Sequence, residues 1–251
     1  MRAICLKSYS CGSILLTKHK TQHFSAVSKE SMDKKIYHGS TRIIRSPHFG
    51  AGRPYNDFGL GFYCTEYPQY AAEWAVGKDS NGFVSAYSLN CDGLRVINLC
   101  GPQYTALHWL YLLLSFRDFD LSSNTARRAR EYINKYFSVD HQGCDCIAGY
   151  RADNRLFMFS QGFLDGDLSY RSLADALTAD DSNRQFVLKS NRAFDRITFT
   201  DYRPASSADS YPVKYSREIR AIKKADRYAE SGLFINDLIE QEVRPYDTRL
   251  R

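Results

Sequence analysis

The sequence predicts a mixed α+β fold. Short stretches typical of strands alternate with longer helical stretches, and glycine, proline and asparagine mark the turns between them. The 251 residues contain no internal repeat or low-complexity tract. A content of 43% hydrophobic and 14% aromatic residues is typical of a globular protein and excludes disorder for most of the chain. We therefore predict one α+β domain with its helices inserted between strands.

The strands are expected in short runs rich in aromatic and β-branched residues. They are placed at residues 36–38, 61–65, 83–89, 94–98, 144–150, 184–189 and 196–200. A loop marked by Gly50, Gly52, Pro54 and Asn56 separates the first two strands. The third and fourth strands are predicted to pair through the turn at residues 90–93, whose sequence is Asn-Cys-Asp-Gly.

The helices are expected where apolar residues recur at helical spacing. They are placed at residues 68–76, 106–116, 125–137 and 216–242, the last broken near Ser231 and Gly232. Asn124 is predicted to cap the third helix. A polar stretch at residues 204–210 follows the last strand, so the domain is predicted to span residues 32–204 and a C-terminal helical extension residues 205–251.

Residues 1–31 are predicted to lie outside the domain. They are polar, lack hydrophobic periodicity and hold five Lys and Arg against one Glu. We interpret them as a disordered leader or the product of an upstream start codon, and a secretion or targeting leader is the alternative. Their apolar stretch, residues 14–16, is too short for the hydrophobic region of a signal peptide.

Charge and cysteine content exclude several classes of protein. The net charge of +6 comes mostly from residues 1–31, so the body is not a basic surface made for nucleic acid. The longest apolar run, residues 106–116, is too short to cross a bilayer, and no membrane contact is expected. Seven cysteines without a CxxC pair indicate reduced thiols and a cytoplasmic protein. No histidine has a partner at metal-ligand spacing, so no metal is expected.

Two segments carry the residues typical of a binding site. Residues 37–40 are Tyr-His-Gly-Ser, and residues 57–65 are Asp-Phe-Gly-Leu-Gly-Phe-Tyr-Cys-Thr. Glycines beside an aromatic strand allow the backbone to approach a ligand closely. The loop at residues 47–56, which carries Arg53, is suited to lie over such a ligand. Together these segments predict a pocket with one flat wall and several polar groups.

His-Gly-Ser followed by Phe-Gly-x-Gly-Phe-Tyr resembles the ADP-ribosyltransferases of the diphtheria-toxin and poly-ADP-ribose-polymerase branch. The chain is similar, more closely, to small bacterial proteins of that fold, many described only as domains of unknown function. The resemblance extends over about residues 35–200 and includes the segments AAEWA, CDCIAGYRAD and RQFVLKSNRAFDRITF. It implies an ADP-ribosyltransferase-like split β-sheet with inserted and C-terminal helices.

The resemblance implies a role for each motif residue. His38 falls on the histidine that hydrogen-bonds a hydroxyl of the nicotinamide ribose, and Gly39 on the glycine whose backbone holds the nicotinamide carboxamide. Ser40 completes this NAD-binding motif. Tyr63 falls on the tyrosine that stacks on the nicotinamide ring. Gln185 takes the third catalytic position, which in this branch is usually Glu.

Arg42 and Arg53 are candidates for binding the NAD pyrophosphate, because a guanidinium pairs bidentately with phosphate. A solvated surface position is the alternative for each of them.

The glutamine at position 185 changes the expected chemistry. Cleavage of the nicotinamide–ribose bond passes through an oxocarbenium-like state, which a carboxylate stabilises, whereas a neutral amide only orients a hydroxyl. Gln185 cannot act as a general base, so a base would come from the acceptor itself, from Asp57 or from Glu66. This favours transfer of a single ADP-ribose over chain elongation.

The expected function is therefore mono-ADP-ribosyl transfer from NAD to a protein or nucleic-acid acceptor, with release of nicotinamide and without a metal. The alternatives are a catalytically degenerate module that binds NAD or ADP-ribose, and an RNA-directed phosphotransferase of the same fold. By analogy with bacterial toxins and effectors, the protein would be cytoplasmic or delivered into another cell, and an antitoxin or immunity protein would neutralise it.

Overall fold

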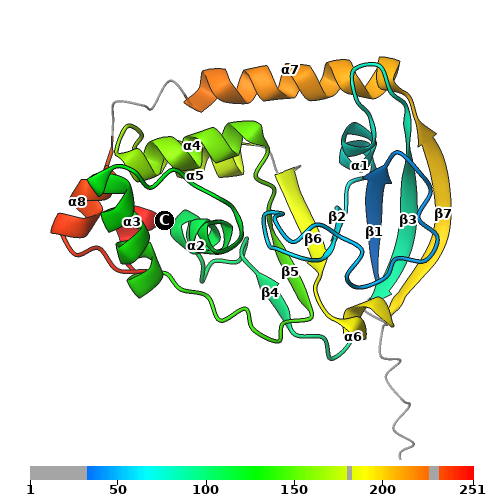
Figure 1. Ribbon diagram of the computed structural model, residues 1–251, viewed down its shortest axis with the longest axis horizontal. Helices are drawn as coiled ribbons and strands as arrows, with labels where there is room; N and C mark the ends of the chain where they lie inside the picture. Colours follow the sequence, from blue (N-terminus) through cyan, green and yellow to red (C-terminus); the bar gives the residue numbers. More distant parts are fainter. Residues whose placement is uncertain (1–32, 180–182, 226–231) are drawn as a thin grey trace, which may run out of the picture. The chain divides into compact units, whose positions relative to one another are not determined.

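The computed structural model describes residues 33–179, 183–225 and 232–251. Their strands form two sheets, of three and four strands, and helices pack against both (Figure 1). The predicted α+β class is confirmed. The predicted leader at residues 1–31 lies outside the described residues.

The three-stranded sheet has the order β1-β3-β7 and is antiparallel throughout. Its strands are β1 at Asp33–Ser40, β3 at Gly82–Asn90 and β7 at Ile197–Ala205. The register aligns His38 with Ser85 of β3. Because β3 is the central strand, β1 and β7 occupy both of its edges, and neither edge is open to a further strand.

The four-stranded sheet has the order β2-β6-β5-β4. Its strands are β2 at Phe62–Cys64, β6 at Arg184–Leu188, β5 at Cys146–Tyr150 and β4 at Val96–Asn98. The pair β4 and β5 is parallel and the other two pairs are antiparallel. The two sheets meet where Tyr37 of β1 and Thr65 exchange backbone hydrogen bonds of 2.8 and 2.9 Å.

An apolar core contains residues of both sheets. Its buried members are Ile36, Cys64, Tyr87, Leu89, Cys146, Phe186, Leu188 and Ala193. Ala193 belongs to the short helix α6 at Asn191–Phe194, which follows β6. Because side chains alternate between the two faces of a strand, residues such as Ile147 and Val187 point to the opposite face of the four-stranded sheet.

A helical layer covers that opposite face. It consists of α2 at Ala106–Phe116, α3 at Asn124–Tyr136, α4 at Asn154–Asp165, α5 at Tyr170–Thr178 and α8 at Ile235–Glu240. Figure 1 shows α2, α3 and α8 on the side of the four-stranded sheet that faces away from β1, β3 and β7. α2 is apolar around most of its circumference because it lies inside this layer, with Trp109 fully buried.

The end of the chain packs onto the same layer. The hydroxyl of Tyr132 donates to the carbonyl of Val243, and the hydroxyl of Tyr170 donates to the carbonyl of Leu250 at 2.8 Å. Leu250 belongs to a short 3₁₀ helix, η3, at Thr248–Leu250. The C-terminal residues therefore share the hydrophobic core of the preceding helices.

The helix α1 at Pro68–Ala75 covers the other face of the three-stranded sheet, and α7 at Ser207–Ala225 packs against α1 and α5. Small buried residues on both sides of the contact between α1 and the sheet include Ala71, Ala75 and Ala205, and they let the backbones approach closely. Arg217 of α7 pairs with Glu73 of α1. No helix within the described ranges is long and apolar enough to span a membrane.

One predicted pairing is wrong. The strands expected to form a hairpin through residues 90–93 belong to different sheets, since β3 pairs with β1 and β7 whereas β4 pairs with β5. The reason is that β3 has no free edge, and Ile97 of β4 is buried in the core beneath the helical layer. The segment between them is held to β5 instead, because Asp145 accepts from the Arg95 N–H at 2.8 Å.

Several predicted helix boundaries also need correction. Ser123, not Asn124, caps α3, and its hydroxyl accepts from the Ala126 N–H at 3.0 Å. The helices α4 and α5 have no counterpart in the prediction, although Asp153 and Ser169 are typical N-cap residues. The polar stretch at residues 204–210 contains the end of β7 and the start of α7, so the helix predicted from residue 216 begins nine residues earlier, at Ser207.

We expect His108 to make the fold sensitive to acid. Its Nδ1 accepts from the Thr105 N–H at 3.0 Å, and its ring is 7% exposed. Burial, reinforced by Arg251, lowers the pKa of His108 to about 4, against about 6.5 in the unfolded chain. Between these two values the unfolded chain binds more protons, so the free energy of unfolding falls as the pH drops from 6.5 to 4.

The substitution His108→Gln tests this expectation. Glutamine at this position preserves a Thr-x-x-Gln capping box and removes the titrating group. Urea unfolding at several pH values between 7 and 4 is expected to show a smaller loss of stability in the variant than in the wild type. Equal losses in both proteins would contradict the role given to His108.

Candidate functional site

A pocket of about 900 Å³ is lined by residues of both sheets and of four helices or their ends, α1, α2, α4 and α7. Apart from the candidate base Glu66, every residue predicted to bind NAD or to act in catalysis lines it: His38, Gly39, Ser40, Arg42, Arg53, Asp57, Tyr63 and Gln185. These residues come from β1, from the long loop between β1 and β2, from β2 and from β6. The structure thus brings together segments as far apart in the sequence as His38 and Gln185.

His38 lies where the two sheets separate. The antiparallel register that begins at Tyr37 and Thr65 would, if continued, pair Gly39 with Tyr63. Instead, the Tyr63 carbonyl accepts a 2.7 Å hydrogen bond from Nδ1 of His38. The histidine side chain therefore replaces the backbone hydrogen bond that Gly39 would donate to Tyr63. The hydrogen-bonded ladder between β1 and β2 ends at this point.

This hydrogen bond also defines the chemistry of His38. A carbonyl oxygen only accepts, so the ring proton is assigned to Nδ1. Burial lowers the pKa of His38, although the bond to Tyr63 opposes this effect. The ring is therefore neutral at pH 7, and Nε2 carries a lone pair that can accept a hydrogen bond. The ring also stacks on Phe62, with centroids 4.5 Å apart, which holds its plane.

Gly39 is required by the packing of α1 against β1. A Cβ at this position would lie 1.8 Å from the carbonyl oxygen of Ala71 and 2.9 Å from the backbone nitrogen of Ala75, so only glycine lets α1 approach β1. Since backbone groups alternate in direction along a strand, the N–H and C=O of Gly39 face the same edge as those of Tyr37. They therefore point toward the gap between the sheets. The next residue, Ser40, donates to the carbonyl of Arg42 at 2.5 Å and shapes the start of the loop.

The hydroxyl of Tyr63 is used within the chain. It donates to the carbonyl of Gly59 at 2.7 Å and accepts from the N–H of Phe58 at 3.0 Å. Gly59 has φ +72°, a conformation that residues with a side chain rarely adopt. Burial raises the pKa of Tyr63, so the phenol stays neutral. Because the hydroxyl is occupied, the ring face is the part of Tyr63 that can contact a ligand.

Gln185 is 4% exposed and its amide orientation is settled by its partners. Nε2 donates to the carboxylate of Asp57 and to the carbonyl of Tyr150, each at 3.2 Å. Both partners are acceptors, so the NH₂ group must face them and the amide oxygen must face the other way. The amide oxygen is thus the atom that Gln185 can offer to a ligand hydroxyl.

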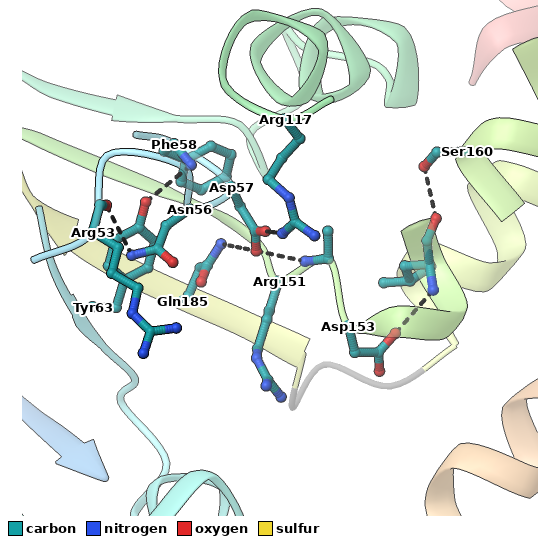
Figure 2. Close-up of polar contacts among 12 residues, drawn as sticks. Arg53, Asn56, Asp57, Phe58, Tyr63, Arg117, Arg151, Asp153, Ser160 and Gln185 are labelled. Atoms are coloured by element: carbon teal, nitrogen blue, oxygen red, sulfur yellow. Dashed lines mark hydrogen bonds and ion pairs between the residues drawn. The ribbon is translucent and has the colours of Figure 1, made fainter. Parts of the chain in front are cut away.

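Asp57 lies at the centre of this network (Figure 2). One oxygen accepts from Arg117 at 2.6 Å, and the other accepts from the Ala152 N–H at 2.8 Å and from Gln185. Burial raises the pKa of Asp57, whereas the Ala152 N–H, Arg117 and Gln185 lower it. The protonated acid would need an acceptor, and all three of these partners are donors, so the arrangement fits an ionised carboxylate.

Outside the hydrogen-bond network around Asp57, the pocket is electropositive. Its lining includes five Lys and Arg side chains against two Asp. Of the two carboxylates, Asp57 is paired with Arg117, and Asp153 caps α4 and lies 3.6 Å from Arg155. The other four cationic side chains are Arg42, Arg53, Arg151 and Lys214. They favour an anionic ligand.

Comparison with known protein families gives a match over most of the chain. Residues 34–199 match the model of DUF3990, a family of proteins of unknown function. The chain belongs to the DUF3990 family. The matched residues include β1, β2, β6 and the whole loop between β1 and β2, and they stop before Lys214 of α7. No curated protein and no solved structure matches this DUF3990 chain.

Several pocket residues of the DUF3990 chain were missed by the sequence reasoning. Trp74, Arg117, Arg151 and Lys214 line the pocket, and the guanidinium of Arg151 lies 5.1 Å from the Trp74 ring centre. Trp74 and Arg151 belong to AAEWA and CDCIAGYRAD, two of the segments over which the chain resembles the ADP-ribosyltransferases. Arg117 follows the end of α2 and Lys214 lies on α7, both outside any motif, so no local signal identified them.

Of the two candidate bases, only Asp57 lies at the pocket. Glu66 is exposed and pairs with Lys34 at 2.8 Å, beside a separate and smaller cavity of about 270 Å³. Within the described part of the DUF3990 chain, no three His, Cys, Asp or Glu side chains gather as metal ligands would.

Proposed function

We propose that the protein transfers a single ADP-ribose from NAD to a macromolecular acceptor and releases nicotinamide. One observation carries the proposal: the seven residues predicted from the sequence to bind NAD or to complete the catalytic triad line one pocket, although they come from four separate segments of the chain. Its volume of about 900 Å³ lies within the range of small-molecule sites.

The polar groups in the pocket suit the two ends of the bond to be cleaved. Nε2 of His38 and the amide oxygen of Gln185 are acceptors, and ribose hydroxyls are donors. The backbone N–H and C=O of Gly39 match the C=O and NH₂ of a carboxamide, and the ring of Tyr63 offers a flat apolar face to nicotinamide. These groups would hold the ribose and nicotinamide in one orientation, which is how an enzyme lowers the entropic part of a barrier.

The cationic side chains suit the middle of the ligand. NAD carries a pyrophosphate between its two nucleosides, and Arg42, Arg53, Arg151 and Lys214 make the pocket electropositive. Arginine binds phosphate oxygens bidentately, so Arg42 and Arg53 keep the pyrophosphate role expected of them, and Arg151 joins them as a third candidate.

A second function is favoured by one specific observation. The side chain at the third catalytic position is the neutral amide of Gln185, which cannot accept a proton or carry a negative charge. The chain could then bind NAD or ADP-ribose without cleaving the glycosidic bond.

The deciding experiment incubates the purified full-length protein with adenine-labelled NAD and a bacterial lysate. Nicotinamide release together with label on macromolecules is expected. Release without label would indicate hydrolysis of NAD. If neither occurs, calorimetric titration with NAD follows, since binding without turnover supports the binding module and no binding overturns both functions.

A further inference from the structure

The pocket holds one carboxylate in contact with the third catalytic residue. The amide of Gln185 donates to the carboxylate of Asp57 at 3.2 Å, and the side chains belong to segments 128 residues apart in the sequence. Asp57 is 6% exposed and lines the pocket beside Gln185. The other carboxylate of the lining, Asp153, is committed to the α4 cap and to Arg155. Asp57 is therefore the negative charge that the structure holds next to the proposed reaction centre.

We infer that Asp57 is a positioning residue that supplies, through the amide of Gln185, the negative charge which Gln185 itself lacks. This inference rests on the proposed function. The amide N–H bonds to Asp57 and to the Tyr150 carbonyl orient Gln185 with its oxygen toward the ligand, and the adjacent carboxylate polarises that amide. The amide oxygen thereby gains electron density where an oxocarbenium-like cation would develop.

The surroundings of Asp57 fit this role better than that of a general base. Arg117, the Ala152 N–H and Gln185 already take three of the four acceptor positions on its two oxygens. The other titratable groups that interact with it are Arg151 and Tyr63. A carboxylate held by three donors keeps its charge and its position, whereas a general base needs a free lone pair near the acceptor.

The competing explanation is purely structural, because Asp57 could serve only to pair with Arg117. The two explanations differ in what a neutral replacement does. In Asp57→Asn, the amide oxygen can still accept from Ala152 and Gln185, but its NH₂ group faces the donor Arg117. Adding Arg117→Gln removes that conflict. The double variant therefore keeps polar side chains at both positions of the network, but it lacks the negative charge of Asp57 and the positive charge of Arg117.

The test compares the rate constant for nicotinamide release, the NAD dissociation constant and the stability of four proteins. These are the wild type, Asp57→Asn, the double variant Asp57→Asn with Arg117→Gln, and Glu73→Gln. Glu73→Gln is the matched control, since Glu73 is a buried carboxylate paired with an arginine outside the pocket. A unit charge at about 6 Å from the cation, at an effective dielectric constant of about 20, changes a rate by roughly 10- to 100-fold.

We expect nicotinamide release to fall by roughly that factor in Asp57→Asn, which leaves the charge of Arg117 unpaired, and by about threefold to tenfold in the double variant, which loses two opposite charges together. In both variants the NAD dissociation constant is expected to stay within about threefold of the wild type. Glu73→Gln is expected to lose stability and to retain the wild-type rate constant. A double variant with the wild-type rate constant, or an Asp57→Asn variant without a loss, would overturn the inference while the proposed function stands. A wild-type protein that releases no nicotinamide overturns the proposed function, and the inference with it.

Discussion

Nicotinamide release from NAD is expected to fall about 100-fold or more when His38 is replaced by alanine. The substitution removes the Nε2 acceptor. It also removes the hydrogen bond from Nδ1 to the Tyr63 carbonyl, which joins β1 to β2. It also removes the ring that stacks on Phe62. The rate constant for nicotinamide release and the NAD dissociation constant, measured with the purified variant, check this expectation.

The control is Tyr37→Phe, on the opposite face of β1, where the side chain packs against the cluster beneath α1. It is expected to retain wild-type turnover, and unfolding by urea would show whether either variant perturbs the strand. If the wild type binds NAD without turnover, His38→Ala is instead expected to weaken binding by about tenfold, the value of one lost hydrogen bond. Wild-type turnover and binding in His38→Ala would remove His38 from the site.

Replacing Trp109 by alanine is expected to lower the free energy of unfolding by about 3–5 kcal/mol. The side chain is fully buried in the core beneath the helical layer, so its removal leaves a cavity. Its indole N–H also donates to the Tyr150 carbonyl at 2.8 Å, the same carbonyl that accepts from Gln185. Because a domain is stable by only about 5–15 kcal/mol, this loss is a large part of the total.

Urea unfolding monitored by circular dichroism measures this loss. Trp109→Phe keeps an aromatic ring and removes the indole N–H, so it is expected to lower the free energy of unfolding by less than Trp109→Ala does. In this variant Gln185 remains as a side-chain donor to the Tyr150 carbonyl. Met158→Ala is the control for a large apolar side chain that is 72% exposed, and a change within about 0.5 kcal/mol is expected. A cost below about 1 kcal/mol for Trp109→Ala would show that the core collapses around the missing ring.

Local sequence patterns predicted the elements that depend on local chemistry. The strands around His38 and Tyr63, the helix that begins at Pro68 and the apolar helix that contains Trp109 all lie where the sequence placed them. In each case the signal is contained within a few neighbouring residues: proline at the first position of a helix, glycines at a turn, or a run of apolar side chains. The motifs His-Gly-Ser and Phe-Gly-x-Gly-Phe-Tyr likewise identified pocket residues, whose roles in NAD binding stay predictions.

The same patterns failed where the answer depended on a distant partner. The turn at residues 90–93 favoured a hairpin, but β7 occupies the edge of β3, and only the assembled sheet excludes β4 from it. Asp57 was a candidate base by its position in the chain, but no local pattern revealed its three hydrogen-bond donors, Arg117, the Ala152 N–H and Gln185.

By itself, the sequence determined the fold class, most of the elements and the motif residues of the pocket, because burial and turn chemistry are encoded in adjacent residues. Only the tertiary structure decided which strands pair, where the ladder between β1 and β2 ends, and which carboxylate contacts Gln185. These features depend on contacts between segments that are distant in the sequence, from 25 residues apart for His38 and Tyr63 to 128 residues apart for Asp57 and Gln185. Hydrogen-bond partners at that distance follow from the fold, and no local pattern encodes them.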